Sequence, residues 1–292
     1  MPRPESLRPR SNARTGGAEV QVIAVTGGKG GTGKTTVAVN LATALAQAGR
    51  RVLLLDGDLG LASVDVLLGL TPTHTLEQVV SGEARLEEIL LRTADGLSVI
   101  PAASGVARMA QLGAAEHAAI VRAFAALPGG HDTLIIDTAP GLHAAVLDFC
   151  QAAQQQLIVL RNEPASLTDA YALVKVLSRE RHVRRFRVLV NMARNGTEAH
   201  NLFLRLQRVT DRYLDVALEY AGEIPEDADV PQAVRAQRTV LAAYPSGPAA
   251  RAYRRLAQDV QRWTAPQQPS GRLEFFFERL LTRPAARLQV IK

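Results

Sequence analysis

Short apolar runs alternate with amphipathic stretches along most of the chain, which is typical of repeated β-α-β units. The apolar runs do not alternate with polar residues, so both faces of each strand are expected to be buried. The pattern therefore predicts an α/β fold: a doubly wound, mostly parallel sheet with helices on both faces. The predicted strands are 20–26, 52–56, 97–101, 133–137, 157–160, 186–191 and 216–224, and the main predicted helices are 35–48, 116–127, 167–179 and 200–213.

Composition shifts divide the chain into four predicted parts. Residues 1–19 are rich in Pro, Arg, Ser and Gly and are expected to form a disordered basic arm, while 20–263 form one folded domain. Residues 264–271 (TAPQQPSG) are expected to form a linker, and 272–292 an amphipathic helix with a short tail.

The predicted C-terminal helix carries one apolar stripe. Its members recur at the spacing i, i+3, i+4, i+7, i+8, and they are Leu273, Phe276, Phe277, Leu280 and Leu281. Basic residues surround this stripe, so the helix suits an anionic membrane surface. Packing against the protein's own body, or against a partner, is the open alternative.

Composition narrows the functional class. The chain has 292 residues and a single cysteine, Cys150, which excludes a disulfide-stabilised fold and a four-cysteine zinc site and suits a reducing cytoplasm. No apolar run reaches the roughly 18 residues of a membrane span, and the N-terminus has no apolar core of a signal peptide. The net charge of +6 resides in residues 251–292, which hold nine basic and three acidic side chains. We expect a cytoplasmic protein.

The strongest motif follows the first predicted strand. Residues 28–35 (GKGGTGKT) fit the P-loop pattern, with an apolar run before them and a helical pattern after them. Such a loop directs successive backbone N–H groups at phosphate oxygens, assisted by the positive end of the following helix. The predicted phosphate-binding residues are Gly28, Lys29, Gly30, Gly31, Thr32, Gly33, Lys34, Thr35 and Thr36. Among these, Lys34 is expected to reach the β- and γ-phosphates and Thr35 to bind Mg²⁺.

Carboxylates end two of the predicted strands. Asp56 and Asp58 follow the strand at 52–56, and Asp137 ends the strand at 133–137. Parallel strands bring their carboxyl ends to the same sheet edge, where α/β proteins bind ligands. These carboxylates are therefore expected near the P-loop, although any one of them could instead cap a helix.

The segment Lys29–Thr36 (KGGTGKTT) resembles the deviant Walker A motif of the MinD/ParA family of ATPases, whose members dimerise face to face around two ATP molecules. The resemblance implies a homodimer in which Lys29 contacts the partner's nucleotide and acts in catalysis with Lys34 and Asp58. It places the attacking water on Asp58, and it assigns switch roles to Asp58, Asp65, Thr138 and Gly141. The strand that ends at Asp137 resembles the family's Walker B strand, so the resemblance implies that Asp56 and Asp137 hold Mg²⁺ together with Thr35. It also implies adenine contacts by Asn191, Pro225 and Glu226, although Asn191 could equally be a turn residue.

The segments 60–70, 101–105, 162–171 and 209–216 resemble one branch of that family, the FleN/FlhG regulators of flagellar number. This resemblance covers about residues 20–282. It implies a slow, dimerisation-dependent ATPase that restrains flagellar number and flagellar gene expression. The implied partners are a FleQ-type transcriptional activator and a polar FlhF-type GTPase, and the protein could associate with the membrane or the cell pole in an ATP-dependent way. Ser63 stands where the family often has Asn.

The alternative function is that of a ParA-type DNA-partitioning ATPase whose arginine-rich terminus binds nucleic acid. A module that holds ATP without turnover is disfavoured by the presence of Asp58 and Asp137. Direct nucleic-acid binding is not expected in the preferred interpretation.

Overall fold

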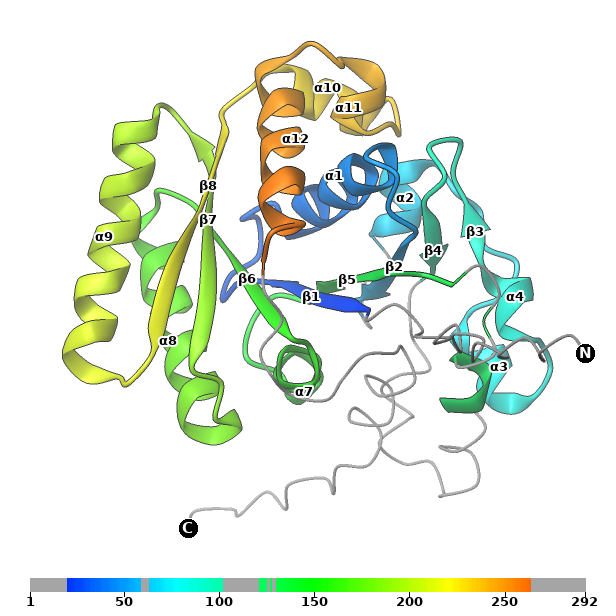
Figure 1. Cartoon of the computed structure of the whole chain (residues 1–292), viewed down its shortest axis with the longest axis horizontal. Helices are drawn as coiled ribbons and strands as arrows, with labels where there is room; N and C mark the ends of the chain where they lie inside the picture. The colour runs from blue at the N-terminus through cyan, green and yellow to red at the C-terminus, as the bar shows by residue number, and fades with distance from the viewer. Residues whose placement is uncertain (1–19, 59–62, 102–120, 125–126, 128–129, 264–292) are drawn as a thin grey trace, which may run out of the picture.

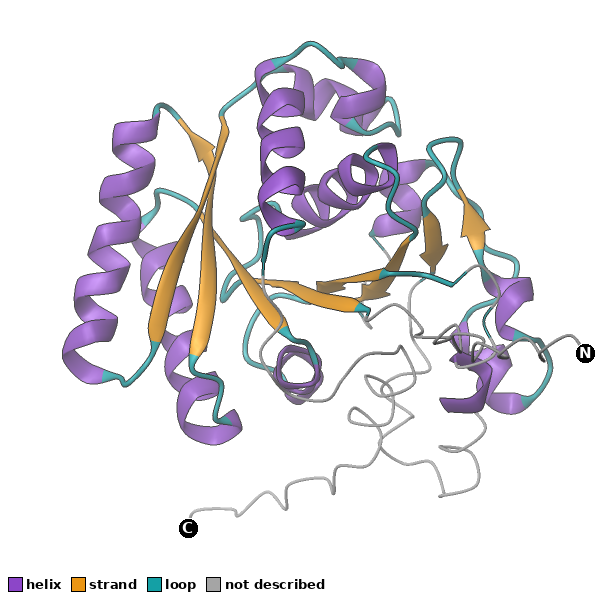
Figure 2. Ribbon diagram, viewed as in Figure 1, coloured by secondary structure: helices purple, strands orange, loops and turns teal. Residues whose placement is uncertain are grey.

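The computed structural model describes residues 20–58, 63–101, 121–124, 127 and 130–263. An eight-stranded sheet, with strand order β3-β4-β2-β5-β1-β6-β7-β8, runs through the molecule (Figure 2). Its strands are β1 (Gln21–Thr26), β2 (Val52–Gly57), β3 (Leu91–Arg92), β4 (Ser98–Ile100), β5 (Thr133–Thr138), β6 (Gln155–Leu160), β7 (Arg185–Ala193) and β8 (Ala217–Pro225). All neighbouring strands are parallel except the edge pair β3 and β4.

Ten helices lie within the described ranges, and they cover both faces of the sheet (Figure 1). They are α1 (Lys34–Gln47), α2 (Val64–Leu68), α3 (Leu76–Ser81), α4 (Leu86–Ile89), α7 (Ala144–Ala152), α8 (Pro164–Arg181), α9 (Gly196–Tyr213), α10 (Asp229–Arg235), α11 (Val240–Ala243) and α12 (Pro248–Val260). Helices α1, α2, α10, α11 and α12 share one face, and α7, α8 and α9 cover the other.

The apolar strands explain these two layers. In β1, Ile23 and Val25 face the core beneath α1 and α12, whereas Val22 and Ala24 face the core beneath α7 and α8. The other central strands are buried on both sides in the same way. The predicted fold class, a doubly wound and mostly parallel sheet, is confirmed.

Several predicted boundaries were wrong by a few residues. Strand β6 begins at Gln155 rather than at residue 157, and β7 extends to Ala193. Helix α8 begins at Pro164, because proline fits the first turn of a helix, and α9 begins at Gly196, after the capping side chain of Asn195. Helix α7 was not predicted; it has nine residues, of which only Asp148 and Gln151 are polar.

Some predictions concern residues outside the described ranges. These are the basic arm 1–19, the linker 264–271, the helix and tail 272–292, and most of the predicted helix 116–127. Within the part of the chain that the structure covers, no helix is both long enough and apolar enough to cross a membrane.

Candidate active site

The P-loop connects β1 to α1 at the carboxyl edge of the sheet. A Cβ atom on Gly28 would lie 2.2 Å from the carbonyl oxygen of Asp169, so α8 leaves room only for glycine. Gly33 has a φ of 87°, and a Cβ there would lie 2.4 Å from the amide nitrogen of Asn191. Both glycines therefore allow the loop to pack tightly between α8 and the end of β7.

Lys34 is buried at the first residue of α1, with 6% of its surface exposed. Its Nζ donates a hydrogen bond to the carbonyl oxygen of Lys29 at 3.0 Å. Burial lowers the pKa of Lys34, while the charges of Asp137 and Asp58 act in the opposite direction. The lysine thus places a positive charge between the loop backbone and two carboxylates.

Asp137 and Asp56 are register partners on the neighbouring strands β5 and β2. Asp137 is 1% exposed, and neither of its carboxylate oxygens has a hydrogen-bond partner. The pKa of Asp137 is raised to about 7, mainly by burial and also by the negative charges of Asp56 and Asp58, while the nearby Thr35 hydroxyl and the charge of Lys34 act in the opposite direction. A buried, unpartnered carboxylate is costly without a cation. Its oxygens and the hydroxyl of Thr35 are the hard donors that Mg²⁺ prefers, so these residues fit that ion.

Asp56 uses its carboxylate differently. Its Oδ1 accepts from the Asp58 N–H at 3.0 Å, and its Oδ2 accepts from the N–H groups of Ser63 at 3.0 Å and Val64 at 3.2 Å. Burial raises the pKa of Asp56, and these three hydrogen bonds lower it. The side chain therefore joins both ends of the connection between β2 and α2, and its predicted role at Mg²⁺ stays a prediction.

Ser63 links this connection to the P-loop. The hydroxyl groups of Ser63 and Thr35 lie 3.2 Å apart and share a hydrogen bond. This hydrogen bond connects the predicted metal ligand Thr35 to the start of α2. The sequence did not predict the contact; it showed only that residue 63 is a serine.

Lys29 points toward the start of α8. Its Nζ lies 3.2 Å from Oε2 of Glu163, and the other oxygen of Glu163 lies 3.1 Å from a guanidinium nitrogen of Arg161. The Lys29 and Glu163 side chains are 40% and 38% exposed. The lysine thus lies at the protein surface, and its contact with a partner's nucleotide stays a prediction.

The predicted switch residues lie near the same edge. The Thr138 hydroxyl donates to the carbonyl oxygen of Val25 at 3.1 Å, and Gly141 has a φ of 96° that favours glycine. Asp65 accepts from the N–H of Val66 at 2.7 Å, within the first turn of α2. Its switch role stays a prediction.

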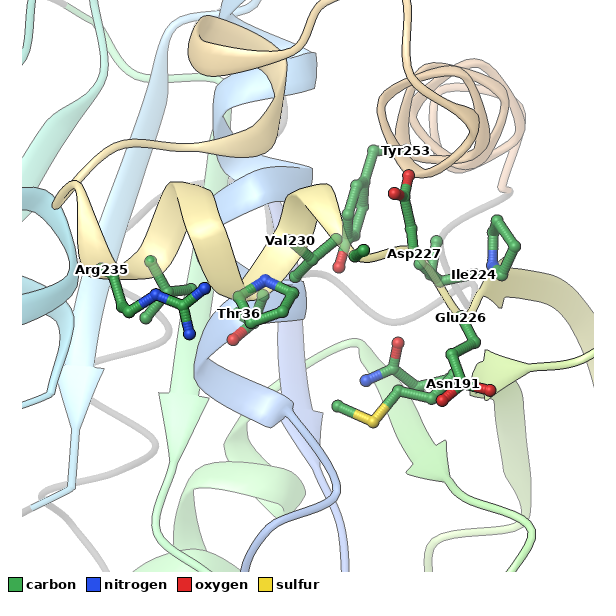
Figure 3. A pocket seen from close by; sticks show the side chains of 13 residues that line it. Thr36, Asn191, Ile224, Glu226, Asp227, Val230, Arg235 and Tyr253 are labelled. Atoms are coloured by element: carbon green, nitrogen blue, oxygen red, sulfur yellow. The ribbon is translucent and has the colours of Figure 1, made fainter.

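A cavity of about 550 Å³ opens beside the P-loop, between the ends of β7 and β8 and the helices α10 and α12 (Figure 3). It brings together four of the predicted nucleotide contacts, from segments far apart in the chain: Thr36, Asn191, Pro225 and Glu226. Its size and mostly apolar lining suit an adenine ring and ribose.

Asn191 is not a turn residue. It lies within β7, is 3% exposed, and donates from its side-chain amide to the carbonyl oxygen of Thr32 at 2.8 Å. The next residue, Met192, has a φ of 55°, unusual for a residue other than glycine. This local geometry connects the base cavity to the P-loop.

Sequence reasoning missed other residues at the cavity. Tyr253 lines it from α12 and is fully buried, and Arg235 lines it from α10. Asp227 accepts from the N–H groups of Asp229 and Ala249, so it fixes the starts of α10 and α12. Of these three residues, only Asp227 could have been predicted from the sequence, because it directly follows the predicted contacts Pro225 and Glu226.

The chain matches a family model described as ParA, NUBPL iron-transfer P-loop NTPase, over residues 19–261. It is 53% identical to the antiactivator FleN of Pseudomonas aeruginosa over 266 residues, which are 91% of this chain and 95% of that protein. It is also 29% identical to the flagellum site-determining protein YlxH of Helicobacter pylori over 89% of both chains.

Solved structures show the same fold. The septum site-determining protein MinD of Pyrococcus horikoshii, complexed with Mg-ADP, superposes with a TM-score of 0.65 at 26% identity, covering 83% of this chain and 96% of that one. The MinC:MinD cell division complex of Aquifex aeolicus gives a TM-score of 0.67 at 25% identity, covering 86% and 100% of the two chains.

Proposed function

The chain belongs to the ParA-type P-loop NTPases, and on that premise we propose that it is a MinD-like ATPase switch that negatively regulates flagellar number and flagellar gene expression. The carrying observation is the unpartnered carboxylate of Asp137 beside Lys34 and Thr35 in a complete P-loop. That arrangement supports binding of a nucleoside triphosphate with Mg²⁺.

Each part of the site has one task in nucleotide binding. The backbone N–H groups from Gly28 to Thr36 and the ammonium of Lys34 bind the phosphates of ATP. Asn191, Pro225 and Glu226 bind the base and ribose in the cavity. Thr35 and Asp137, with Asp56 nearby, hold Mg²⁺, which supplies charge neutralisation on the phosphates when it is bound.

Hydrolysis depends mainly on positioning and charge stabilisation. Asp58 orients the attacking water, and Lys34 stabilises the charge that develops on the γ-phosphate. Lys29 leaves Glu163 and contacts the nucleotide of a second protomer, so turnover is slow and needs the ATP-bound homodimer. Thr138 and Gly141 respond to the γ-phosphate and carry the signal into the β5 to α7 connection.

The flagellar role is supported by the similarity to antiactivator FleN, which extends over nearly the whole of both chains. We propose that the ATP-bound dimer binds a FleQ-type transcriptional activator and acts on a FlhF-type GTPase. The predicted stripe from Leu273 to Leu281 would bind a partner or the anionic membrane, and would bring the protein to the membrane or cell pole.

A ParA-type partitioning role is less favoured. The ParA family ATPase of Chlorobium tepidum is only 20% identical to this chain, which supports a common fold alone. An ATP-dependent, salt-sensitive shift of random duplex DNA would favour partitioning, because phosphate contacts weaken steeply with salt.

The proposal is tested by deleting the gene in its source organism and counting flagella by electron microscopy. We expect excess filaments, restored to the normal number by the wild-type gene and not by the Lys34→Ala variant. A normal filament number together with plasmid loss or anucleate cells would move the protein to the partitioning class.

A further inference from the structure

The outward face of α9 carries a stripe of five exposed residues that the nucleotide site does not use. They recur at the spacing i, i+3, i+4, i+7, i+8, so they lie along one side of the helix, and they are Arg205, Arg208, Val209, Arg212 and Tyr213. We call them the α9 stripe. In the described part of the chain, none of its three arginines forms an ion pair.

The apolar members of the stripe are unusually exposed. Val209 is 39% and Tyr213 is 57% exposed, and these are two of the five large hydrophobic side chains exposed in the described ranges. The Arg212 guanidinium lies 5.3 Å from the centre of the Tyr213 ring, within cation-π distance. A surface that mixes arginine with exposed tyrosine has the composition of a protein-protein hot spot.

The surface is hollowed at both ends of α9. A cavity of about 380 Å³ lies at the start of the helix and includes Asn201 and Arg205 in its lining. Another of about 250 Å³ lies at its end and includes Tyr213 and Arg184. The stripe between them covers about 12 Å of helix, at 1.5 Å per residue, which matches two to three turns of a docked segment.

The position of α9 leaves this surface accessible. Its opposite side packs on the core through Leu202, Phe203 and Leu206, and Figure 1 shows the helix at the outer end of the molecule, away from α1. The α9 stripe therefore lies on the side of the helix that faces away from the core.

We infer that the α9 stripe docks an acidic, partly apolar segment of a protein partner. Carboxylates of that segment pair with Arg205, Arg208 and Arg212, while its apolar side chains contact Val209 and Tyr213. The chain's own C-terminal segment cannot supply the charge, because residues 264–292 hold five basic and two acidic side chains. A protein is favoured over nucleic acid because the apolar side chains interrupt the arginines and Asp211 lies exposed beside them, where it would repel phosphates.

The identity of the partner rests on the proposed function, which names a FleQ-type activator. The experiment measures binding of that purified activator, from the same organism, to the full-length chain with Mg-ATP by biolayer interferometry. The test variant is Arg205→Glu/Arg208→Glu, and the matched control is Arg251→Glu/Arg255→Glu on the exposed side of α12, which has the same change of charge. We expect the test variant to lose about tenfold or more in affinity, while the control keeps wild-type affinity.

Two further readouts separate the outcomes. ATP affinity and dimer formation are expected to be unchanged in the test variant, and Tyr213→Phe is expected to bind better than Tyr213→Ala. Equal activator binding by the test variant and the wild type would overturn the α9 stripe and leave the proposed function intact. A wild-type chain that binds no activator would overturn both.

The same variants are mixed with random duplex DNA and with anionic phosphatidylglycerol vesicles. If the wild type binds the DNA or the vesicles, and only Arg205→Glu/Arg208→Glu loses that binding, the α9 stripe is a site for that ligand and the protein assignment is overturned. Absence of such binding, with the activator result above, supports it.

Discussion

The two edges of the central sheet differ in how the carboxylates at the two ends of β5 are satisfied. At the amino edge, before β5, Asp132 accepts from Arg50 at 2.7 Å, and on β7 Arg187 pairs with Glu219 at 2.8 Å and lies over the Trp263 ring at 4.4 Å. At the carboxyl edge, both oxygens of the buried Asp137 lack a partner. The amino edge has its own exception, since Nδ1 of His131 is also unpartnered.

This difference distinguishes side chains that stabilise the fold from side chains that bind a ligand. Paired ions at the amino edge stabilise the chain by itself. At the carboxyl edge, the buried charges of Asp137 and Lys34 carry a desolvation cost that bound phosphates and a cation would offset. Substitutions at the two edges should therefore separate function from stability.

The largest effect is expected from Lys34→Ala. Loss of the buried ammonium removes the main positive charge facing the phosphates, so ATP affinity should fall by about 100-fold or more. Titration with a fluorescent ATP analogue measures this. Lys175→Ala, on the exposed side of α8, is the control and should bind normally; equal affinities for the two variants would refute the assignment of Lys34.

Asp58→Ala comes next. We expect turnover to fall by about 100- to 1,000-fold with ATP binding and dimerisation retained, since the carboxylate orients water rather than holding nucleotide. A phosphate-release assay, beside equilibrium binding and light scattering, checks this. Asp95→Ala, at a turn where the half-exposed carboxylate accepts from Gln47, is the control, and a normal turnover of Asp58→Ala would make the water-orienting role wrong.

Asp137→Asn should change binding and stability in opposite directions. Because the pKa of Asp137 is about 7 in the folded chain, the folded chain binds a proton at this carboxylate more tightly than the unfolded chain does. Proton binding at Asp137 therefore stabilises the fold at acidic pH, and this contribution to the unfolding free energy is lost as pH rises through about 7. We expect the ligand-free variant to be more stable than the wild type above pH 7, by about 1–3 kcal/mol, and to lose the Mg²⁺ dependence of ATP binding.

Thermal denaturation between pH 5 and 9 and Mg²⁺ titrations measure these two effects. A wild-type stability that does not change across this window, relative to the variant, would show that Asp137 is ionised at no cost in the ligand-free chain.

Asp132→Asn tests the amino edge. Burial alone would raise the pKa of Asp132, but hydrogen bonds from Arg50, the Arg51 N–H and Thr133 outweigh it and hold the pKa below its usual range. We expect a loss of about 1–3 kcal/mol in unfolding free energy at pH 7 with unchanged ATP affinity. Because the folded pKa is depressed, the difference should disappear as pH falls below about 4. Urea denaturation at pH 7 and below pH 4 measures the difference in unfolding free energy between the variant and the wild type. A weakened ATP affinity of Asp132→Asn would contradict the idea that the amino edge serves stability and the carboxyl edge serves nucleotide binding.

The smallest effect is expected from Ser63→Ala. Removal of its hydroxyl bond to Thr35 should raise the Mg²⁺ concentration needed for half-maximal ATP binding by about two- to fivefold. Ser63→Thr keeps a hydroxyl and should restore the wild-type value. Identical Mg²⁺ dependence in the alanine variant would show that this hydroxyl contact has no part in metal binding.

The sequence by itself determined the parallel sheet, because strands buried on both faces need continuous apolar runs, and it determined the P-loop, because its glycines, Lys34 and Thr35 are adjacent in the chain. For Ser63 the sequence showed only the residue type and did not predict its contact with Thr35. Tertiary structure decided the contacts between distant segments: Asn191 on Thr32, Tyr253 in the base cavity, and Glu163 on Lys29. It also decided that polar Gln155 begins a strand, through pairing with Ile23 of β1. The local pattern of apolar residues shows which face of a segment is buried. The contacts between distant residues form only when the sheet places strands side by side that are far apart in the chain.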